Sequence, residues 1–300
     1  MKKIWNWRNY QIAWKVQGEL NDKSDIAIVL IHGFGACKDH WRYNQKRISL
    51  IAPCYSIDLV GFGESTKPDS QLLYEKKTSN NFNYCFDNWS QQVFDFCNEI
   101  VKKPVLLIGN SIGGVIALNT SEKLSEKCLG IVLIDCAQRT MDDKRLNEQS
   151  LLMRFLRPVI KTLVRQRFLS SNLFKNAANP TFIEKILKVA YPSGNNVNEE
   201  LVEILYKPTQ GKGAPEAFRG FINLFDDYLA PHLLKNINHP VHLIWGEKDP
   251  WEPVQEAQTW FENFECVKSL EVILDAGHCP HDEMPEKVNP VIEKIIQEAI

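Results

Sequence analysis

One stretch of the chain, residues 104–118, constrains the fold more tightly than any other. The apolar run 104–108 leads directly into Gly109-Asn110-Ser111-Ile112-Gly113, and a second apolar run begins at Val115. This order predicts a buried strand, a sharp turn and a helix. The Gly-x-Ser-x-Gly pattern in that setting is typical of a nucleophile elbow, where a side chain at either glycine would clash. Ser111 is therefore the candidate nucleophile, at the point where strand becomes helix.

Short apolar runs rich in β-branched residues recur along the chain and predict the strands of one sheet. They lie at 26–31, 55–60, 104–108, 131–134, 241–245 and 270–274. Near-continuous apolarity in runs this short indicates strands buried on both faces, and hence a mostly parallel sheet. Stretches with helical spacing separate them, such as 89–101. Strand alternating with helix predicts an α/β fold in which helices flank a central sheet.

The alternation stops after Asp135 and resumes only near Pro240, which predicts an insertion. We expect a core in two parts, residues 1–136 and 239–300, and a helical lid at 137–238. The prolines expected to break the lid into separate helices are Pro158, Pro180, Pro192 and Pro208. An insertion over the ends of parallel strands would roof the place where ligands bind in such sheets.

The composition bears on several classes of protein. The formal net charge of the 300 residues is −2, so no overall field draws the chain toward nucleic acid. The eight cysteines follow no paired spacing, which gives no case for a disulfide framework or a metal site, and no motif implies a cofactor. The first residues show no apolar leader, and no run approaches the roughly 18 apolar residues of a membrane span. We expect an unprocessed, soluble protein of the reducing cytoplasm, with a polar surface loop at 76–81.

A second motif, Ile31-His32-Gly33-Phe34-Gly35, follows the predicted strand 26–31 and supplies a candidate oxyanion donor. A His-Gly-x-Gly turn in this place typically offers a backbone N–H to a developing oxyanion. We expect Phe34 and Ile112, the residue after the nucleophile, to be the pair of donors. The N-terminus of the helix that follows Ser111 favours the same negative charge. His32 is expected to be structural and to anchor the loop by hydrogen bonds.

A serine hydroxyl needs a base, and usually a carboxylate that fixes the tautomer of that base. His278 follows the last predicted strand and is the expected base, with His281 a weaker contender on the same loop. Asp249 follows the strand 241–245 and is the expected acid. Asp135 is the alternative acid, because it directly follows the strand 131–134. Glu247 and Glu252, on either side of Asp249, are expected to be solvated or bonded within their loop.

With these residues in place, the chain resembles the α/β-hydrolase superfamily over residues 10–299. The order Ser111, Asp249, His278 is the order of that superfamily, and the stretch 58–68 is similar to a loop that lid-bearing members carry after their fourth strand. More narrowly, the motifs at 33–36, 109–114, 245–253 and 277–280 resemble a cyanobacterial and plastid branch that includes chlorophyll dephytylases and pheophytinases. The resemblance implies a serine hydrolase that acts on a lipophilic ester, with the phytyl ester of a chlorophyll-type pigment as the leading candidate.

The predicted lid also carries a basic stripe. Arg154, Arg157, Lys161 and Arg165 are spaced by three, four and four residues, which would put them on one face of a helix. Residues 139–190 hold eleven Lys or Arg against four Asp or Glu. Such a face could rest weakly on an anionic membrane. The simpler interpretation is an ordinary amphipathic helix, with a solvated basic face and an apolar face over the active site.

Three kinds of function are compatible with these residues. The first is hydrolysis of a carboxylic ester through an acyl-enzyme on Ser111. The second is an epoxide hydrolase, a haloalkane dehalogenase or a carbon–carbon bond hydrolase. Epoxide hydrolases and dehalogenases use an aspartate at the elbow, because displacement at sp³ carbon needs a carboxylate, and Ser111 argues against both. The third is a non-hydrolytic ligand receptor or a lyase on the same fold.

Overall fold

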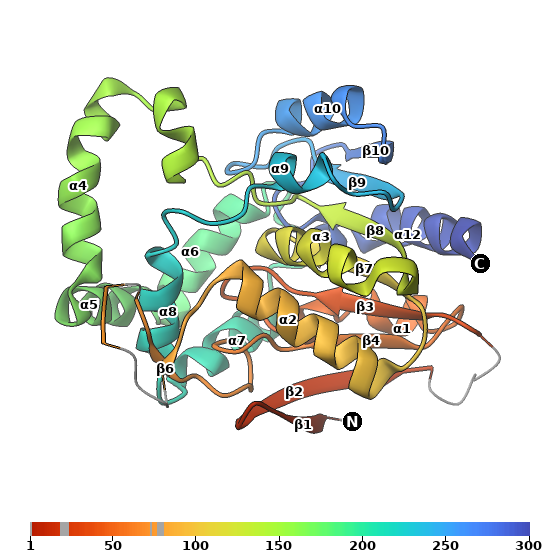
Figure 1. The fold of residues 1–300 in the computed structure, drawn as a ribbon, viewed down its shortest axis with the longest axis horizontal. Helices are drawn as coiled ribbons and strands as arrows, with labels where there is room; N and C mark the ends of the chain where they lie inside the picture. The colour runs from red at the N-terminus through yellow and green to blue at the C-terminus, as the bar shows by residue number, and fades with distance from the viewer. Residues whose placement is uncertain (1, 19–23, 73, 77–80) are drawn as a thin grey trace.

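Eight strands form one sheet in the computed structural model, which describes residues 2–18, 24–72, 74–76 and 81–300 (Figure 1). Across the sheet the strands follow the order β1-β2-β4-β3-β7-β8-β9-β10. β1 and β2 are antiparallel to their neighbours, whereas the six strands from β4 to β10 are parallel. The mostly parallel central sheet predicted from the sequence is confirmed.

Each of the six parallel strands overlaps one of the predicted apolar runs. The strands of the sheet are β1 (Lys3–Trp7), β2 (Tyr10–Gln17), β3 (Ala27–Ile31), β4 (Cys54–Ile57), β7 (Val105–Asn110), β8 (Cys128–Ile134), β9 (Val241–Gly246) and β10 (Val267–Ile273). A separate parallel pair consists of β5 (Asp69–Ser70) and β6 (Asn81–Phe82). The antiparallel strands β1 and β2 were not among the predicted runs.

The strand predicted at 55–60 is shorter than its apolar run, since β4 ends at Ile57. The backbone N–H groups that follow bond to side chains rather than to a neighbouring strand. Leu59 donates to a ring nitrogen of His32 at 3.1 Å, and Val60 donates to the side-chain oxygen of Gln92 at 2.9 Å. The apolar run therefore leaves the sheet early because side chains satisfy its backbone.

Helices cover both faces of the sheet (Figure 1). On one face lie α2 (Phe86–Phe96), α3 (Ile112–Leu124), α9 (Ala230–Leu234) and α10 (Val254–Asn263), and on the other lie α1 (Gln45–Ile48) and α12 (Pro285–Ala299). Short helical turns complete these layers: η1 (Lys38–Trp41), η2 (Cys97–Val101), η3 (Ser125–Lys127) and α11 (Pro280–Glu283). The helix predicted at 89–101 corresponds to α2 and η2, which are continuous.

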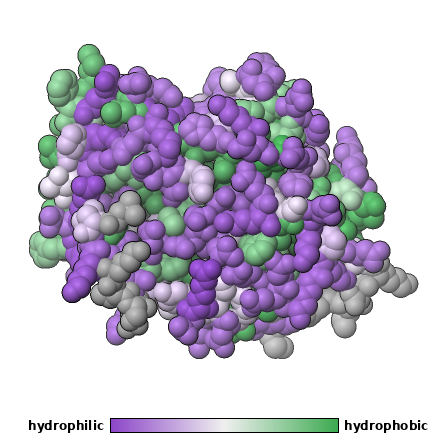
Figure 2. Space-filling model, viewed as in Figure 1, coloured by the Kyte–Doolittle hydropathy of each residue, from purple (hydrophilic) through white to green (hydrophobic). Residues whose placement is uncertain are grey.

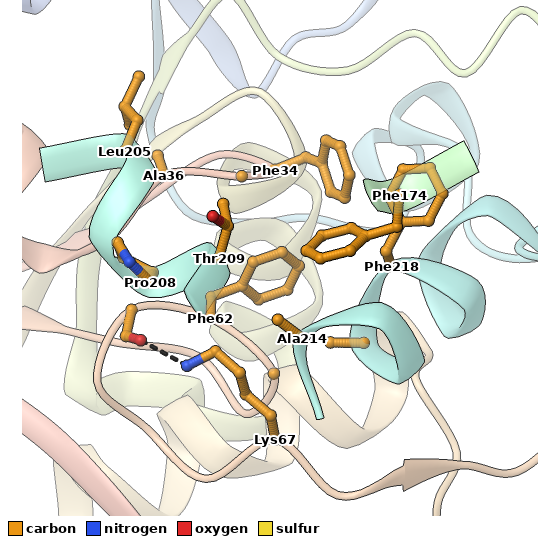
Figure 3. Close-up of a pocket in the computed structure, with 14 residues that line it drawn as sticks. Phe34, Ala36, Phe62, Lys67, Phe174, Leu205, Pro208, Thr209, Ala214 and Phe218 are labelled. Atoms are coloured by element: carbon orange, nitrogen blue, oxygen red, sulfur yellow. Dashed lines mark hydrogen bonds between the residues drawn. The ribbon is translucent and has the colours of Figure 1, made fainter. Parts of the chain in front are cut away.

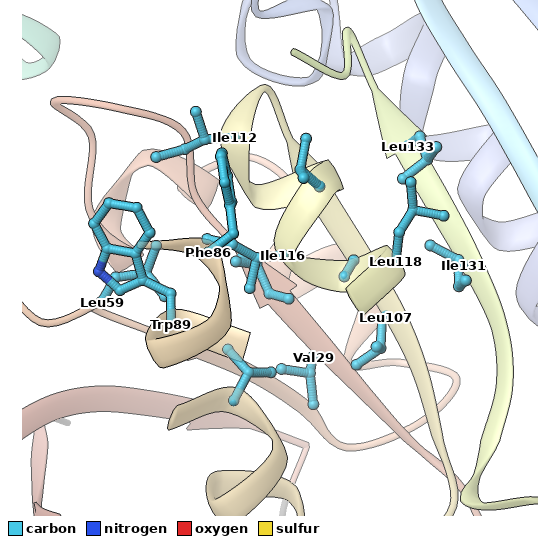
Figure 4. Close-up of a cluster of buried hydrophobic side chains, with 14 of the residues drawn as sticks. Val29, Leu59, Phe86, Trp89, Leu107, Ile112, Ile116, Leu118, Ile131 and Leu133 are labelled. Carbon is cyan, nitrogen blue, oxygen red and sulfur yellow. The ribbon is translucent and has the colours of Figure 1, made fainter. Parts of the chain in front are cut away.

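Alternate residues of the central strands face opposite sides and contribute to two apolar layers. In β3, Val29 joins the layer beneath α2 and α3, whereas Ile28 and Leu30 join the layer beneath α12. Figure 4 shows side chains of the first layer, which come from the sheet, α2 and α3. Burial on both faces is the physical reason that the parallel strands read as near-continuous apolar runs.

Between β8 and β9 the chain leaves the sheet and forms a helical segment, which we call the insertion (residues 137–238). Its helices are η4 (Asp143–Glu148), α4 (Leu151–Arg165), α5 (Arg167–Ala177), α6 (Pro180–Ala190), α7 (Glu199–Tyr206), η5 (Lys207–Gln210), α8 (Ala214–Ile222) and α9. In Figure 1, α4 stands at the left edge of the molecule, well away from α10 and β10. The boundaries of a separate lid domain, and its role as a lid, stay predictions.

Three of the four prolines expected to break the insertion lie at or next to helix ends, namely Pro180, Pro192 and Pro208. The prediction for Pro158 is wrong, because this proline lies inside α4 and the helix continues past it. Arg157 before the proline and Lys161 after it both bond to the carboxylate of Asp143. These two ion pairs hold successive turns of α4 in place although Pro158 cannot donate a backbone hydrogen bond.

The same ion pairs correct the expected orientation of the basic stripe. The guanidinium of Arg157 and the ammonium of Lys161 both lie over the ring of Phe225, so this part of the stripe faces the protein and not the solvent. Of the helices described, none combines the length and apolar character that crossing a bilayer would require. Most of the polar loop predicted at 76–81 lies outside the described residues.

Candidate active site

Ser111 lies at the turn between β7 and α3, in a backbone conformation that few residues adopt. Its φ is 54° and its ψ is −121°. A Cβ on Gly109 would lie 2.2 Å from the carbonyl oxygen of Gly113, and a Cβ on Gly113 would lie 2.3 Å from the carbonyl oxygen of Ile31. The turn is therefore packed tightly against β3, and it leaves 8% of Ser111 exposed.

The loop after β3 packs directly against Ser111. A Cβ on Gly33 would lie 3.1 Å from the Cβ of Ser111, so glycine lets the two backbones come this close. Phe34, one of the two predicted oxyanion donors, is the next residue. The other, Ile112, is the first residue of α3, and the first N–H groups of a helix have no acceptor within it. Both predicted donors therefore belong to segments that border the serine.

His32 holds this loop in place in its neutral form. Its Nε2 accepts from the backbone N–H of Leu59 at 3.1 Å, and its Nδ1 donates to the carbonyl oxygen of Gly33 at 2.7 Å. Burial lowers the pKa of His32 to about 4, so the ring is uncharged at neutral pH. These bonds match the structural role predicted for this residue.

His278 and Asp249 come together from the loops after β10 and β9. The Nδ1 of His278 donates to one carboxylate oxygen of Asp249 at 2.7 Å. The other oxygen accepts the backbone N–H groups of Trp251 and Glu252, at 2.9 and 3.1 Å. Burial by itself would raise the pKa of Asp249, but the hydrogen bond and charge of His278 outweigh burial, and the pKa is lowered. With Asp249 ionised and Nδ1 carrying the proton, the Nε2 of neutral His278 is left as a base.

Two contacts tie the histidine loop to its surroundings. The side-chain amide of Asn110, the neighbour of Ser111, donates to the carbonyl oxygen of His278 at 3.2 Å. A Cβ on Gly277 would lie 2.1 Å from the carbonyl oxygen of Ala190, so the loop also lies against the end of α6. The backbone of the predicted base is therefore anchored both to the elbow and to the insertion.

Asp135, the alternative acid, contacts Asp249 and the strand beside it. Its fully buried carboxylate accepts the backbone N–H of Gly246 at 2.9 Å. Burial, reinforced by the neighbouring charge of Asp249, raises the pKa of Asp135 well above its usual range. A protonated Asp135 can donate a hydrogen bond to Asp249. Of the two candidate acids, Asp249 is the one that bonds to His278.

A model of the alpha/beta hydrolase family matches residues 28–291, most of the chain. The chain belongs to that family. The fold and the enzyme class predicted from the sequence are thereby confirmed: this is a hydrolase of the α/β-hydrolase fold.

Two relatives and one solved structure illustrate the similarity. The uncharacterized hydrolase YugF of Bacillus subtilis is 24% identical over 273 residues, which cover 90% of this chain and 89% of YugF. The chloroplastic pheophytinase of Arabidopsis thaliana is 23% identical over 290 residues, and the match covers 88% of this hydrolase but 59% of the pheophytinase. The structure of CarC, a serine hydrolase involved in carbazole degradation, aligns with a TM-score of 0.76 at 17% identity, covering 99% of this chain and 98% of that one. The predicted resemblance to the pheophytinase branch thus has a counterpart among the relatives.

Glu252 is the residue near His278 that sequence reasoning missed. It is partly buried, and its carboxylate accepts the backbone N–H of Gln138 at 2.8 Å, so it is bonded within the protein and not solvated. Burial raises the pKa of Glu252 to about 7, although the nearby His278 partly offsets this effect. The adjacent Trp251 packs edge-on to the ring of His278, with 5.0 Å between centroids. The one signal in the sequence was that both residues follow Asp249 closely.

The other histidine of the loop, His281, lies in the interior of the hydrolase. It is fully buried, and its ring centroid is 4.4 Å from that of Trp41. Burial lowers the pKa of His281 well below its usual value. Packing against an aromatic core residue fits the loop-stabilising role more closely than the role of a base.

An apolar pocket of this hydrolase opens beside the predicted oxyanion loop (Figure 3). Its aromatic lining comes from the core, through Phe34 and Phe62, and from the insertion, through Phe174 of α5 and Phe218 of α8. The charged member of the lining is Lys67, whose ammonium group donates to the carbonyl oxygen of Gly63 at 2.5 Å. Ser111 is not part of the lining. The pocket and the serine therefore lie on either side of a shared loop, the one that carries Phe34.

Proposed function

We propose that this hydrolase cleaves a carboxylic ester through an acyl-enzyme on Ser111. The observation that carries the proposal is the 2.7 Å hydrogen bond from His278 to Asp249, on a loop that is bonded to the elbow through Asn110. A histidine held in this tautomer can take the proton of a serine hydroxyl and make the oxygen nucleophilic.

In the proposed reaction, the Oγ of Ser111 attacks the ester carbonyl carbon while the Nε2 of His278 takes the hydroxyl proton. The backbone N–H groups of Phe34 and Ile112 stabilise the oxyanion, and the positive end of α3 adds to this effect. The histidinium, stabilised by Asp249, then protonates the departing alcohol as the C–O bond breaks. Water, deprotonated by the same histidine, attacks the acyl-enzyme, and the acid leaves as Ser111 regains its proton.

The serine itself separates this proposal from epoxide hydrolysis and dehalogenation, which need an aspartate at the elbow. A tyrosine of the insertion would be required to donate a proton to an epoxide oxygen. Tyr191 is fully buried, accepts from His40 at 2.8 Å and donates to Asp282 at 3.0 Å. Its hydroxyl is thus engaged in the interior of the protein, which further supports acyl transfer.

The substrate that we propose is a lipophilic ester. The pocket beside Phe34 is walled by aromatic rings, and its one charged lining residue, Lys67, is already bonded to Gly63. Apolar walls favour a long or ring-bearing chain over a charged one. Because a pheophytinase is among the relatives, the phytyl ester of a chlorophyll-type pigment is the leading candidate.

We further propose a cytoplasmic location, with the insertion acting as a lid that touches a membrane peripherally. All eight cysteines are free thiols, as is usual in a reducing compartment. A lid at a membrane surface would give the enzyme access to esters that partition into lipid.

Labelling with a fluorophosphonate tests the chemistry of Ser111. The folded wild-type protein should form one adduct, located on Ser111 by mass spectrometry, and Ser111→Ala should form none. A folded wild-type protein that stays unlabelled at neutral pH would exclude acyl transfer and leave the receptor or lyase alternatives.

A panel of esters graded by chain length, with a pheophytin-type phytyl ester included, tests the substrate class. The value of kcat/KM should rise with chain length if the aromatic pocket holds the chain. Faster hydrolysis of short, water-soluble esters would contradict the lipophilic assignment without affecting the serine mechanism.

A further inference from the structure

The large apolar side chains that the described residues leave exposed are concentrated on three helices of the insertion. Twelve of 22 belong to α4, α5 and α6. Six of them lie on α4 and form what we call its apolar face: Leu151, Leu152, Phe155, Leu156, Val159 and Leu163. Figure 2 shows hydrophobic surface along the left edge of the molecule, where Figure 1 places α4 and α5. Exposed apolar surface concentrated in this way marks a site of interaction.

The orientation of α4 is the reverse of that expected for a helix of a globular protein, whose apolar stripe faces the core. Its exposed apolar residues recur every four positions from Leu151 and from Leu152, as one face of a helix does. The residues turned toward the protein are Arg157 and Lys161, which pair with Asp143. Arg157 is the one buried residue of the helix. α4 is therefore held by ion pairs, with its apolar face presented outward.

The charges of this part of the insertion are almost all positive. Residues 150–190 include eight Lys or Arg and a single acidic residue, Glu184. Four of the eight cations pair with carboxylates. The other four, Arg154, Arg165, Lys175 and Lys185, are exposed and form no ion pair with the residues described. The apolar face thus lies in a segment with an uncompensated positive charge.

We propose that the apolar face of α4, together with the exposed apolar residues of α5, docks on the surface of an anionic phospholipid bilayer. The apolar side chains would enter the boundary between headgroups and acyl chains, and the exposed cations would pair with lipid phosphates. This inference rests on the peripheral membrane contact proposed above and names the surface that makes it. That surface is the apolar face of α4, and the basic stripe serves to hold the helix in this orientation.

Charge argues against a second copy of the chain as the occupant of this face. In a two-fold dimer the same patch lies on both sides of the interface. Four exposed cations would then meet the same four cations, with Glu184 as the one acidic residue of the segment and already paired with Lys188. An anionic bilayer supplies both the apolar phase and the negative charge that this surface lacks.

Co-sedimentation with vesicles tests the proposal, and Ser111→Ala is the background in which to run it, because no lipid can then be hydrolysed through the serine. The protein should bind vesicles of phosphatidylcholine with phosphatidylglycerol more tightly than vesicles of phosphatidylcholine alone. Leu151→Asp with Leu152→Asp should weaken binding by about a hundredfold, because two leucines, 70% and 68% exposed in the free protein, no longer enter the bilayer.

A matched control carries the same substitutions outside the insertion, at Leu50 and Leu274, which are 70% and 60% exposed. Leu50→Asp with Leu274→Asp should leave vesicle binding within about twofold of the parent, since neither residue lies on α4 or α5. Equal losses in both double variants would contradict a specific role for α4. Absence of binding to either kind of vesicle would overturn the proposal, whatever the labelling of wild-type Ser111 shows.

Two further measurements distinguish the remaining occupants. Light scattering should show the same mass for the parent and for Leu151→Asp with Leu152→Asp; a dimer that this variant dissociates would assign the face to a second copy. Without vesicles, the Leu151→Asp, Leu152→Asp pair in the Ser111 form should leave KM for a soluble ester unchanged. A raised KM would mean that α4 closes over the active site, which would overturn docking on a bilayer.

Discussion

The elbow and α4 differ in where their side chains find partners. Around Ser111 the partners are internal: every residue of β3 and of β7 is buried, and the turn tolerates no atom beyond glycine at two positions. In α4, one residue out of 15 is buried, and it is an arginine. The difference teaches that the geometry of the elbow is determined by packing within the chain, whereas the orientation of α4 leaves an apolar surface for something outside it.

Removing the nucleophile should give the largest effect and test whether the packed region serves chemistry. Ser111→Ala should lower kcat for an ester by about 10⁴-fold or more, since the other parts of the site supply the remaining catalysis. Because the change removes one buried oxygen and adds no atom, the midpoint of thermal unfolding should stay within about 3 °C of the wild type. A variant that keeps a tenth of the wild-type rate would rule out Ser111 as nucleophile.

Asparagine at each candidate acid sharpens the comparison within the packed region. Asp249→Asn should lower kcat by about 10⁴-fold, because an amide stabilises the wrong tautomer of His278. Asp135→Asn should lower kcat by less than about tenfold, because its carboxyl contacts Asp249 and Gly246 instead. Steady-state kinetics on one ester decides between them, and the reverse ranking would make Asp135 the acid.

Adding a methyl group separates the packed elbow from the insertion by stability alone. Gly109→Ala should lower the free energy of unfolding by more than about 3 kcal/mol, because its Cβ would lie 2.2 Å from the carbonyl oxygen of Gly113. The matched control is Gly194 of the insertion, where a Cβ meets no atom within 4 Å and only the φ of 72° is unfavourable. Gly194→Ala should lower it by about 1 kcal/mol in urea unfolding. Equal losses at the two glycines would remove the contrast.

Glu252 connects the packed region to pH. Its pKa is raised from 4.5 to about 7 on folding, mainly by burial. At low pH both the folded and the unfolded chain are protonated there; as the pH rises through 4.5 the unfolded chain ionises first, and stability is lost until about pH 7. Glu252→Gln removes this loss, so its free energy of unfolding relative to wild type should rise by about 2 kcal/mol between pH 4 and pH 8. A difference that is independent of pH would contradict the raised pKa.

The smallest effect is expected on the apolar face of α4. Leu152→Asp should change the free energy of unfolding by less than about 0.5 kcal/mol, because the side chain is 68% exposed and loses little contact within the protein. Urea unfolding without lipid measures this change. A loss of 2 kcal/mol or more would mean that the leucine is packed internally, and the contrast between the two regions would fail.

Local patterns sufficed for the parallel strands and for the elbow, but an antiparallel hairpin was missed at the N-terminus. β1 and β2 are joined at Arg8 and Asn9, whose φ angles are 46° and 69°. Asparagine in a two-residue turn between alternating polar and apolar residues was the signal available. Its strength was low because arginine, unlike glycine, does not announce a left-handed conformation.

The candidate site was predictable to the extent that each residue follows a strand. Asp249 and His278 were proposed from their positions after predicted strands, and the structure brings them within 2.7 Å of each other. The contacts of Glu252 and Asn110 carried no such signal, since a loop residue can face solvent or protein without any change in sequence pattern. Their partners, Gln138 and the backbone of His278, are remote along the chain.

By itself, the sequence determined the mostly parallel sheet, the strand-turn-helix at Ser111 and the membership of the family, because buried strands need continuous apolar runs and a strained turn needs glycine. Only the tertiary structure decided which carboxylate bonds to His278 and which face of α4 points outward. Both depend on where remote segments lie: Asp135 and Asp249 each follow a strand, and periodicity defines the two faces of a helix without saying which one Asp143 will hold.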